Sequence, residues 1–169
     1  MPKGDHRSSQ TGMFRLDLPR RKWIHLSGQG AVSGSERNAL VYDSKRDRLV
    51  LLVGRGDAAM HEWPVSAGKP KWAGLPMTGQ PPKTFAREAV YVPKSDRIVC
   101  LTPQGLYDCD LAGGNRWRKL LAEPQGTVIH ALLYDAELDV MVMLFGKGSG
   151  SVQPVNVWLM RYDPAGWGK

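Results

Sequence analysis

The feature that most constrains how this chain folds is an internal repeat marked by tryptophan. Four tryptophans follow one another at intervals of 49, 45 and 50 residues: Trp23, Trp72, Trp117 and Trp167. A leucine stands three positions after each of the first three. Repeats with a period of about 20 to 50 residues are stacks of one small structural unit. We therefore expect several similar units rather than a single continuous core.

A second block of sequence recurs between the tryptophans. It reads ALVYDSKRDRLVLL from Ala39, AVYVPKSDRIVCL from Ala89 and ALLYDAELDVMVML from Ala131. In each copy, two runs rich in Val, Leu and Ile flank a short polar turn, with a Tyr before the turn and an Asp after it. This pattern predicts two antiparallel strands joined by a tight turn. The corresponding residues are Tyr42, Tyr91 and Tyr134, and Asp47, Asp96 and Asp139.

Each unit continues with a turn, a third apolar run and, at the next tryptophan, a fourth run. Apolar residues at the spacing of a helix face, sustained over about ten positions, occur nowhere in the chain. The near-continuous apolar runs LVLLV and VMVMLF indicate strands that are covered on both faces. The sequence thus predicts an all-β chain made of units of four antiparallel strands.

The blocks RNALVYDSKRDRLVLLVGRG and IHALLYDAELDVMVMLFGKG, the latter followed by VNVWLMRYDPAGW, resemble kelch repeats, and the resemblance covers residues 13 to 167. A kelch repeat has a hairpin, a pair of glycines, a spaced aromatic residue and a tryptophan. Here the glycine pair appears as Gly54 with Gly56 and as Gly146 with Gly148, each split by a basic residue, while the middle unit has Thr-Pro instead. The resemblance implies a β-propeller, whose blades are sheets of four antiparallel strands.

On this interpretation the chain holds about three to three and a half blades. The expected parts are a disordered basic tail at 1–12, a half blade at 13–27, blades at 36–76 and 86–121, and an incomplete blade at 129–167. Propellers close with about four to eight blades, and closure covers their faces and strand edges. We therefore expect completion by self-association, with two chains forming a ring of about six blades, or by another propeller segment. The remaining alternative is a piece of a longer product.

Charge and composition exclude several classes of function. The 169 residues carry a net charge of +7, of which residues 1–26 contribute +4. The rest of the chain mixes acids and bases along its turns, so a nucleic-acid interface is not expected. No run of about 18 apolar residues occurs, and the N-terminus lacks the apolar core of a signal peptide. We expect no membrane association and favour the cytoplasm.

Patterns for catalysis or metal binding are weak. The four histidines are scattered, and none lies at metal-ligand spacing from another His, Cys or carboxylate. No glycine-flanked nucleophile and no phosphate-binding glycine motif occur, and no cofactor is expected. We interpret the paired carboxylates as turn-forming acids rather than acid–base pairs. These pairs are Asp43 with Asp47, Asp108 with Asp110, and Asp135 with Asp139.

The expected binding surface is the end of the ring where the innermost strands begin, together with the loops that follow the hairpins. Kelch-like proteins carry an arginine at this channel mouth, which corresponds to Arg37 and Arg87. Such an arginine can bind carboxylates or anchor a neighbouring loop. Asn38, Glu88 and His130 are expected one step later. The loop candidates are Arg55, His61, Lys147 and Ser149.

Cys100 and Cys109 flank a predicted turn. If this turn is centred between Gln104 and Gly105, the two cysteines lie directly opposite each other on paired strands. Their Cα atoms are then within about 5.5 Å, which permits a disulfide in an oxidising compartment. In a reducing cytoplasm they remain small buried thiols, and this is the state that we expect.

These patterns together predict a non-catalytic module that binds a protein or carbohydrate partner through the loops of kelch-like blades. The alternative from a different class is a propeller enzyme of the glycan hydrolase or lyase type. An enzyme needs a cluster of buried ionisable side chains at the channel mouth, whereas a binding module needs only an exposed surface. An inactive piece of a longer propeller protein is the third alternative.

Overall fold

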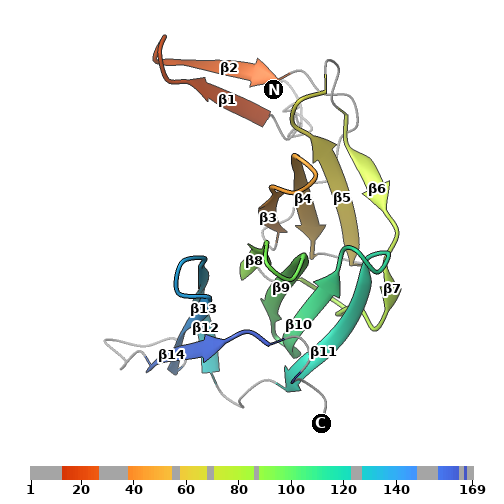
Figure 1. Cartoon of the computed structure of the whole chain (residues 1–169), viewed down its shortest axis with the longest axis vertical. Coiled ribbons are helices and arrows are strands. Elements are labelled where there is room, and N and C mark those ends of the chain that lie inside the picture. The colour runs from red at the N-terminus through yellow and green to blue at the C-terminus, as the bar shows by residue number, and fades with distance from the viewer. Residues whose placement is uncertain are drawn as a thin grey trace, which may run out of the picture.

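The computed structural model describes residues 13–26, 38–54, 58–67, 71–85, 88–122, 127–147, 156–163 and 166. These residues form strands and turns with no helix, so the prediction of an all-β chain is confirmed. No helix in the described ranges could therefore span a membrane. The strands form a two-stranded N-terminal hairpin and three larger sheets, which follow one another along an open arc (Figure 1). The tail expected at 1–12 lies outside the described residues.

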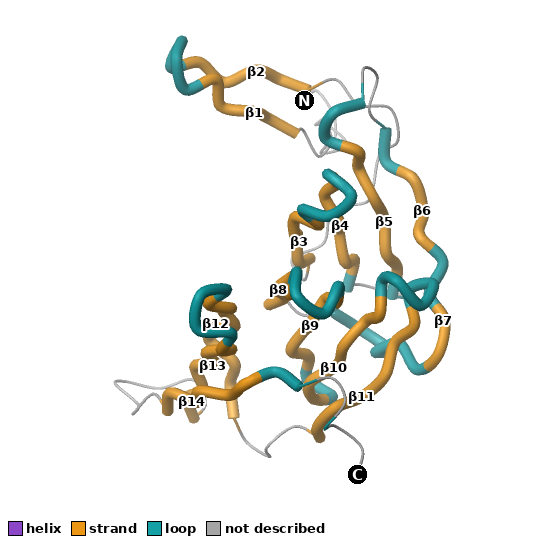
Figure 2. The backbone as a smooth tube through the Cα atoms, viewed as in Figure 1, coloured by secondary structure: helices purple, strands orange, loops and turns teal. Residues whose placement is uncertain are grey.

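Short turns join most of the strands that are neighbours within a sheet (Figure 2). The N-terminal hairpin consists of β1 (Met13–Asp17) and β2 (Lys22–Leu26), which pair antiparallel. The first sheet has four antiparallel strands in the order β3-β4-β5-β6. Its strands are β3 (Asn38–Asp43), β4 (Arg48–Val53), β5 (Ala59–Pro64) and β6 (Ala73–Leu75).

The second sheet repeats this order with one addition. Its strands are β8 (Glu88–Val92), β9 (Arg97–Thr102), β10 (Gly105–Asp110) and β11 (Arg116–Ala122). The short β7 (Thr78–Gly79) pairs parallel with the outer edge of β11. The third sheet has the order β12-β13-β14. Its strands are β12 (Thr127–Asp135), β13 (Val140–Lys147) and β14 (Asn156–Arg161).

The same four-residue turn closes the first hairpin of all three sheets. Its last residue has a left-handed backbone, with φ of 49° at Asp47, 54° at Asp96 and 54° at Asp139. Aspartate accepts this conformation better than most residues, because its short side chain forms local hydrogen bonds. The tyrosine before each turn donates a hydrogen bond to that aspartate, at 2.7, 3.0 and 2.8 Å respectively. The recurring Tyr and Asp of the sequence are thus the two ends of one hydrogen bond.

Two apolar cores lie between consecutive sheets. Val50 of the first sheet belongs to one buried cluster with Ile98 of the second sheet. Val99, the next residue of β9, belongs to the other buried cluster, with Met141 of the third sheet. Neighbouring residues of a strand point to opposite faces, so the second sheet is covered on both of its faces. The first and third sheets are each covered on one face by a neighbouring sheet.

The first strands of the three sheets lie next to one another. β3 contacts β8, and β8 contacts β12, across the boundaries between sheets. These strands line the inner side of the arc, whereas β6 and β11 lie on its outer side (Figure 1). The sheets are therefore arranged around a shared inner row of strands.

Candidate functional site

The structure defines only part of the binding surface expected from the sequence. Asn38 and Glu88 are the first residues of β3 and β8, so both lie where innermost strands begin. His61 was expected in a loop, but it lies within β5, where burial lowers the pKa of its imidazole. The remaining candidates that fall outside the described residues are Arg37, Arg55, Arg87 and Ser149.

The strand register corrects one expected equivalence. Asn38 pairs with Val53 and lies four residues before Tyr42, whereas Glu88 lies three residues before Tyr91. Glu88 pairs with Leu101, the equivalent of Leu52, so Glu88 is equivalent to Ala39 and the expected match of Asn38 with Glu88 is wrong by one residue. The reason is that the second unit has one residue fewer before its tyrosine, which the letters alone do not locate.

Two more of the expected residues, His130 and Lys147, lie on strands of the third sheet. His130 lies four residues before Tyr134, at a shift of the β12–β13 register between Ile129 and Ala131. A bulge of this kind re-aims the strand locally. Lys147 is the last residue of β13 and pairs with Thr127.

Ion pairs join the hairpin turns of neighbouring sheets. Lys45 Nζ lies 3.5 Å from Asp96 Oδ2, and Lys94, at the same position of the next turn, pairs with Asp139. Each of these cations thus reaches the left-handed aspartate of the following sheet. In the third turn the same position is Glu137, so the third sheet offers a carboxylate where the first two offer an ammonium group.

Arg46 strengthens the first of these boundaries. Its Nη1 and Nη2 donate to the two carboxylate oxygens of Asp96 at 2.8 and 2.7 Å, and Nη1 also lies 3.1 Å from Asp43 Oδ2. These contacts, together with the hydrogen bond from Tyr91, lower the pKa of Asp96 to about 2. A bidentate, largely buried pair of this kind is stronger than an ordinary surface ion pair.

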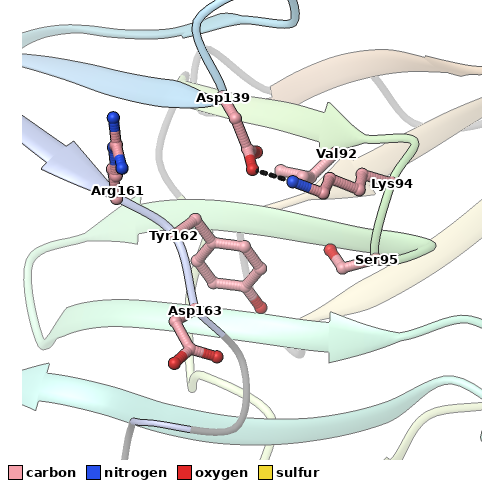
Figure 3. A pocket seen from close by; sticks show the side chains of 7 residues that line it. All are labelled: Val92, Lys94, Ser95, Asp139, Arg161, Tyr162 and Asp163. Atoms are coloured by element: carbon pink, nitrogen blue, oxygen red, sulfur yellow. Dashed lines mark hydrogen bonds and ion pairs between the residues drawn. The ribbon is translucent and has the colours of Figure 1, made fainter.

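A cavity of about 430 Å³ lies at the corresponding place between the second and third sheets (Figure 3). Ser95 stands where Arg46 stands in the preceding turn, and its buried Oγ has no hydrogen-bond partner among the described residues. The cavity therefore corresponds to the space that the guanidinium group of Arg46 fills at the boundary between the first and second sheets. Its lining has as many cations as carboxylates, so its charge selects neither anions nor cations. The lining residues are Val92, Lys94, Ser95, Asp139, Arg161, Tyr162 and Asp163.

Asp108 is a fully buried carboxylate that links two sheets. Arg118 binds it through Nε at 2.8 Å and Nη2 at 2.9 Å, and Arg97 Nη1 donates to it at 3.2 Å. The hydroxyl of Tyr162, which follows β14, donates to the same carboxylate. In the first sheet, Arg48 and Glu62 form the pair equivalent to Arg97 and Asp108, with a nitrogen–oxygen distance of 2.5 Å. Both oxygens of Asp108 thus accept hydrogen bonds, and this carboxylate cross-links the second and third sheets.

The paired acids that the sequence predicts to form turns divide into two groups. Asp43 accepts the backbone N–H of Lys45 and Arg46, and Asp135 accepts those of the third turn. Asp110 accepts the N–H of Gly113 in the turn after β10. The prediction that these acids form turns is confirmed. For Asp108 the prediction is wrong, because this residue lies within β10 with cationic partners instead of backbone N–H groups.

The two cysteines are free thiols, but the predicted register between them is wrong. Cys100 pairs with Tyr107 and Cys109 pairs with Ile98, so the thiols are diagonal neighbours on one face of the sheet. The turn residues are Pro103 and Gln104, one position earlier than expected. Diagonal Cα atoms are about 7 to 8 Å apart, beyond the usual reach of a disulfide.

Among the described residues, no sheet covers the two end faces of the arc, one on the first sheet and one on the third, and both faces carry exposed apolar side chains. On the third sheet, Leu133, Val157 and Leu159 are 56%, 59% and 71% exposed. On the first sheet, Leu40 and Tyr42 are about half exposed. We call these the third-sheet face and the first-sheet face. Monomeric proteins rarely leave an apolar sheet face in water, so both are candidate interaction surfaces.

The residue that follows the third strand of each sheet also indicates that the first sheet lacks a neighbouring sheet on one side. Leu111 follows β10 and is buried against the first sheet, and Tyr162 follows β14 and is buried against the second. Val65 holds this position after β5, and it is 46% exposed because no described sheet packs against this side of the first sheet. Val65 thus lacks the neighbouring sheet against which Leu111 and Tyr162 are buried.

Comparisons with known proteins add no identity. No known family model matches the chain, and a search of curated proteins found no significant match. The two apolar sheet faces are the exposed features that the described residues offer for an interaction. Within the described residues, no group of three or more His, Cys, Asp or Glu could hold a metal ion.

Proposed function

We propose that the chain forms blades of a kelch-like β-propeller and acts as a non-catalytic interaction module that a second copy completes. The row of first strands β3, β8 and β12 supports this, because propeller blades share their innermost strands around a central channel. The recurring hairpins with their Tyr–Asp hydrogen bonds support the repeat on which the resemblance to kelch proteins depends.

One observation carries the proposal: the two uncovered faces are the two kinds of face that pack together inside the chain. At the first boundary, the face with Val50 meets the face with Ile98. At the second, the face with Val99 meets the face with Met141. By register, Val50, Val99 and Val142 are equivalent, and so are Leu49, Ile98 and Met141. The uncovered third-sheet face is of the Val142 kind, and the uncovered first-sheet face is of the Leu49 kind.

A second copy can therefore repeat the internal packing. Its first-sheet face would cover the third-sheet face of the first copy, and Val65 would gain the contact that Leu111 and Tyr162 already have. Two chains joined in this way at both ends form a closed ring of about six sheets, within the usual range for propellers. The innermost strand ends, which include Asn38 and Glu88, would then surround the channel mouth that presents the binding surface.

The joint between copies lacks one favourable contact. By the pattern of Lys45 with Asp96 and Lys94 with Asp139, the turn of the third sheet would bring Glu137 close to Asp47 of the next copy. Two carboxylates repel, so this joint is weaker than the internal boundaries at low ionic strength. The apolar faces supply the attraction.

Light scattering on the purified chain tests the proposal. The expected mass is twice 18.7 kDa at micromolar concentration. Replacing the exposed Leu159 by Lys places a charge in the third-sheet face and should return the mass to 18.7 kDa. Leu121→Lys is the matched control, because Leu121 is exposed on β11 of the second sheet and belongs to neither uncovered face. A folded wild-type monomer at about 100 µM would overturn the proposal.

A further inference from the structure

We propose that β2 of one copy adds to the open edge of β14 in the next copy, so that one sheet of the ring is built from two chains. This inference rests on the proposed association and specifies its partner strand. The free edges, the exposure of one tryptophan and the lengths of the connections each support it.

The first support is the unpaired edge of β14. In the first sheet the third strand β5 pairs with β6, and in the second sheet β10 pairs with β11. In the third sheet, β14 pairs with β13 alone among the described strands. A row of unpaired N–H and C=O groups along a flat strand is a template for another strand.

The second support is the N-terminal hairpin, which lies apart from the sheets (Figure 1). Trp23 on β2 is 68% exposed. Trp117, which occupies the equivalent ladder position on β11, is 1% exposed and packs on Phe85 with ring centroids 5.2 Å apart. An indole left in water carries a large unfavourable hydration term. The hairpin therefore has the side chain of a fourth strand without the sheet that would bury it.

The third support is the length of the connections. Residues 76–87 lead from the fourth strand β6 of the first sheet to the innermost strand β8 of the next sheet. Residues 27–37 lead from β2 to the innermost strand β3, a connection that is one residue shorter. A chain of this length can therefore place β2 as the fourth strand of the sheet that precedes β3. In the head-to-tail pair, that preceding sheet is the third sheet of the other copy.

The equivalent strands of the second sheet predict the register. Trp117 pairs with Cys109 in β10, and Cys109 is equivalent to Met160 by its position relative to the hairpin. Trp23 should therefore lie opposite Met160, and Ile24 opposite Leu159. Met160 is partly buried on the side that faces the second core, so Trp23 would extend this core with a sulfur–aromatic contact. β1 would stay on the other edge of β2, as β7 does on β11.

Disulfide cross-linking between two chains that each carry one added cysteine, beside the buried Cys100 and Cys109, tests this register. Trp23→Cys in one chain is mixed with Met160→Cys in the other, and Ile24→Cys with Leu159→Cys forms the neighbouring pair. One of these two pairs is of the non-hydrogen-bonded type, whose Cβ atoms are closer. Mild oxidation should yield a covalent dimer on a non-reducing gel for at least one of them. The off-register mixture of Trp23→Cys with Leu159→Cys should yield several-fold less, and the parent chain none, because Cys100 and Cys109 are buried.

The outcomes separate this inference from the proposed function. A non-covalent dimer by light scattering that forms no in-register cross-link overturns the strand addition and leaves the association of faces standing. A monomer that forms no cross-link overturns both. Equal cross-linking in all mixtures also overturns the proposed register. An in-register cross-link within one chain that carries both Trp23→Cys and Met160→Cys, without the product between chains, would show that the hairpin closes onto its own chain.

Discussion

Arg46 and Asp96 form a bidentate ion pair across the boundary between the first and second sheets, with nitrogen–oxygen distances of 2.8 and 2.7 Å. Asp96 also has a left-handed backbone and accepts the hydroxyl of Tyr91 at 3.0 Å. One aspartate thus closes its own hairpin and holds the preceding one.

Asp96→Asn should destabilise the chain by about 2 kcal/mol. Asparagine keeps the preference for a left-handed backbone and most of the shape, but it removes the charge that Arg46 binds. Asp47→Asn is the matched control, because Asp47 has the same backbone and tyrosine contact, and the side chains that donate to it among the described residues, Tyr42 and Ser66, are uncharged. Urea unfolding of the two variants measures the difference. Equal losses would show that the cross-sheet ion pair contributes little.

The same aspartate should give the protein a specific acid sensitivity. The pKa of Asp96 falls from 3.8 to about 2 in the folded chain, first because of Arg46 and then because of Tyr91. A lowered folded-state pKa stabilises the fold above about pH 4, and this stabilisation is lost as the pH falls from about 4 towards 2. The free energy of unfolding, measured by urea titration across this range, should fall less steeply in Asp96→Asn than in the parent. Parallel slopes would contradict the assignment.

Ser95→Arg should stabilise the second boundary by about 1 kcal/mol. The new guanidinium would enter the cavity beside Ser95 and bind Asp139 as Arg46 binds Asp96. Ser95→Met is the control, since it fills similar space without a charge. Thermal unfolding should rank the arginine variant above the methionine variant and the parent. A ranking with methionine first would show that packing, and not ion pairing, limits this boundary.

The thiols should be unreactive in the folded protein. Cys100 is 1% exposed and Cys109 is fully buried, and burial raises the pKa of both, in Cys109 to about 12. Thiolate is the reactive form, so at pH 8 an aromatic disulfide reagent should titrate close to two thiols only after denaturant is added. Zero thiols in denaturant would reveal a disulfide and overturn the observed register.

The sequence predicts the hairpins well because their signal is local. A tyrosine, a polar turn and an aspartate recur within a few residues, and the left-handed backbone at Asp96 is a property that aspartate itself favours. The register of the cysteine hairpin was missed by one turn position because its two-residue turn, Pro103-Gln104, depends on hydrogen bonds of Thr102 with Gln104 and Gly105. A turn formed by Pro103 and Gln104 and a turn formed by Gln104 and Gly105 fit the sequence equally well.

The candidate site was harder to predict because its parts are distant in sequence. The burial of Asp108 comes from Tyr162, which lies 54 residues away, and from an arginine on the neighbouring strand. The cavity beside Ser95 arises because Ser95 is smaller than Arg46, which holds the same position in the preceding turn, and this difference has no local signal in the sequence. The exposure of Trp23 identifies the hairpin as unpacked, whereas its sequence resembles that around the buried Trp117.

Glu137→Lys should strengthen the association of two copies several-fold. The substitution restores at the joint the pattern of Lys45 with Asp96 and Lys94 with Asp139, placing an ammonium group next to Asp47 of the neighbouring copy. Such an exposed pair is screened by salt, so the gain should shrink between low salt and about 1 M NaCl. Sedimentation equilibrium measures the dissociation constant in both conditions. Ala136→Lys is the control, because it adds a cation to the same turn at a position outside the pattern. An equal gain in both variants would indicate a general charge effect and would contradict the proposed contact between Glu137 and Asp47.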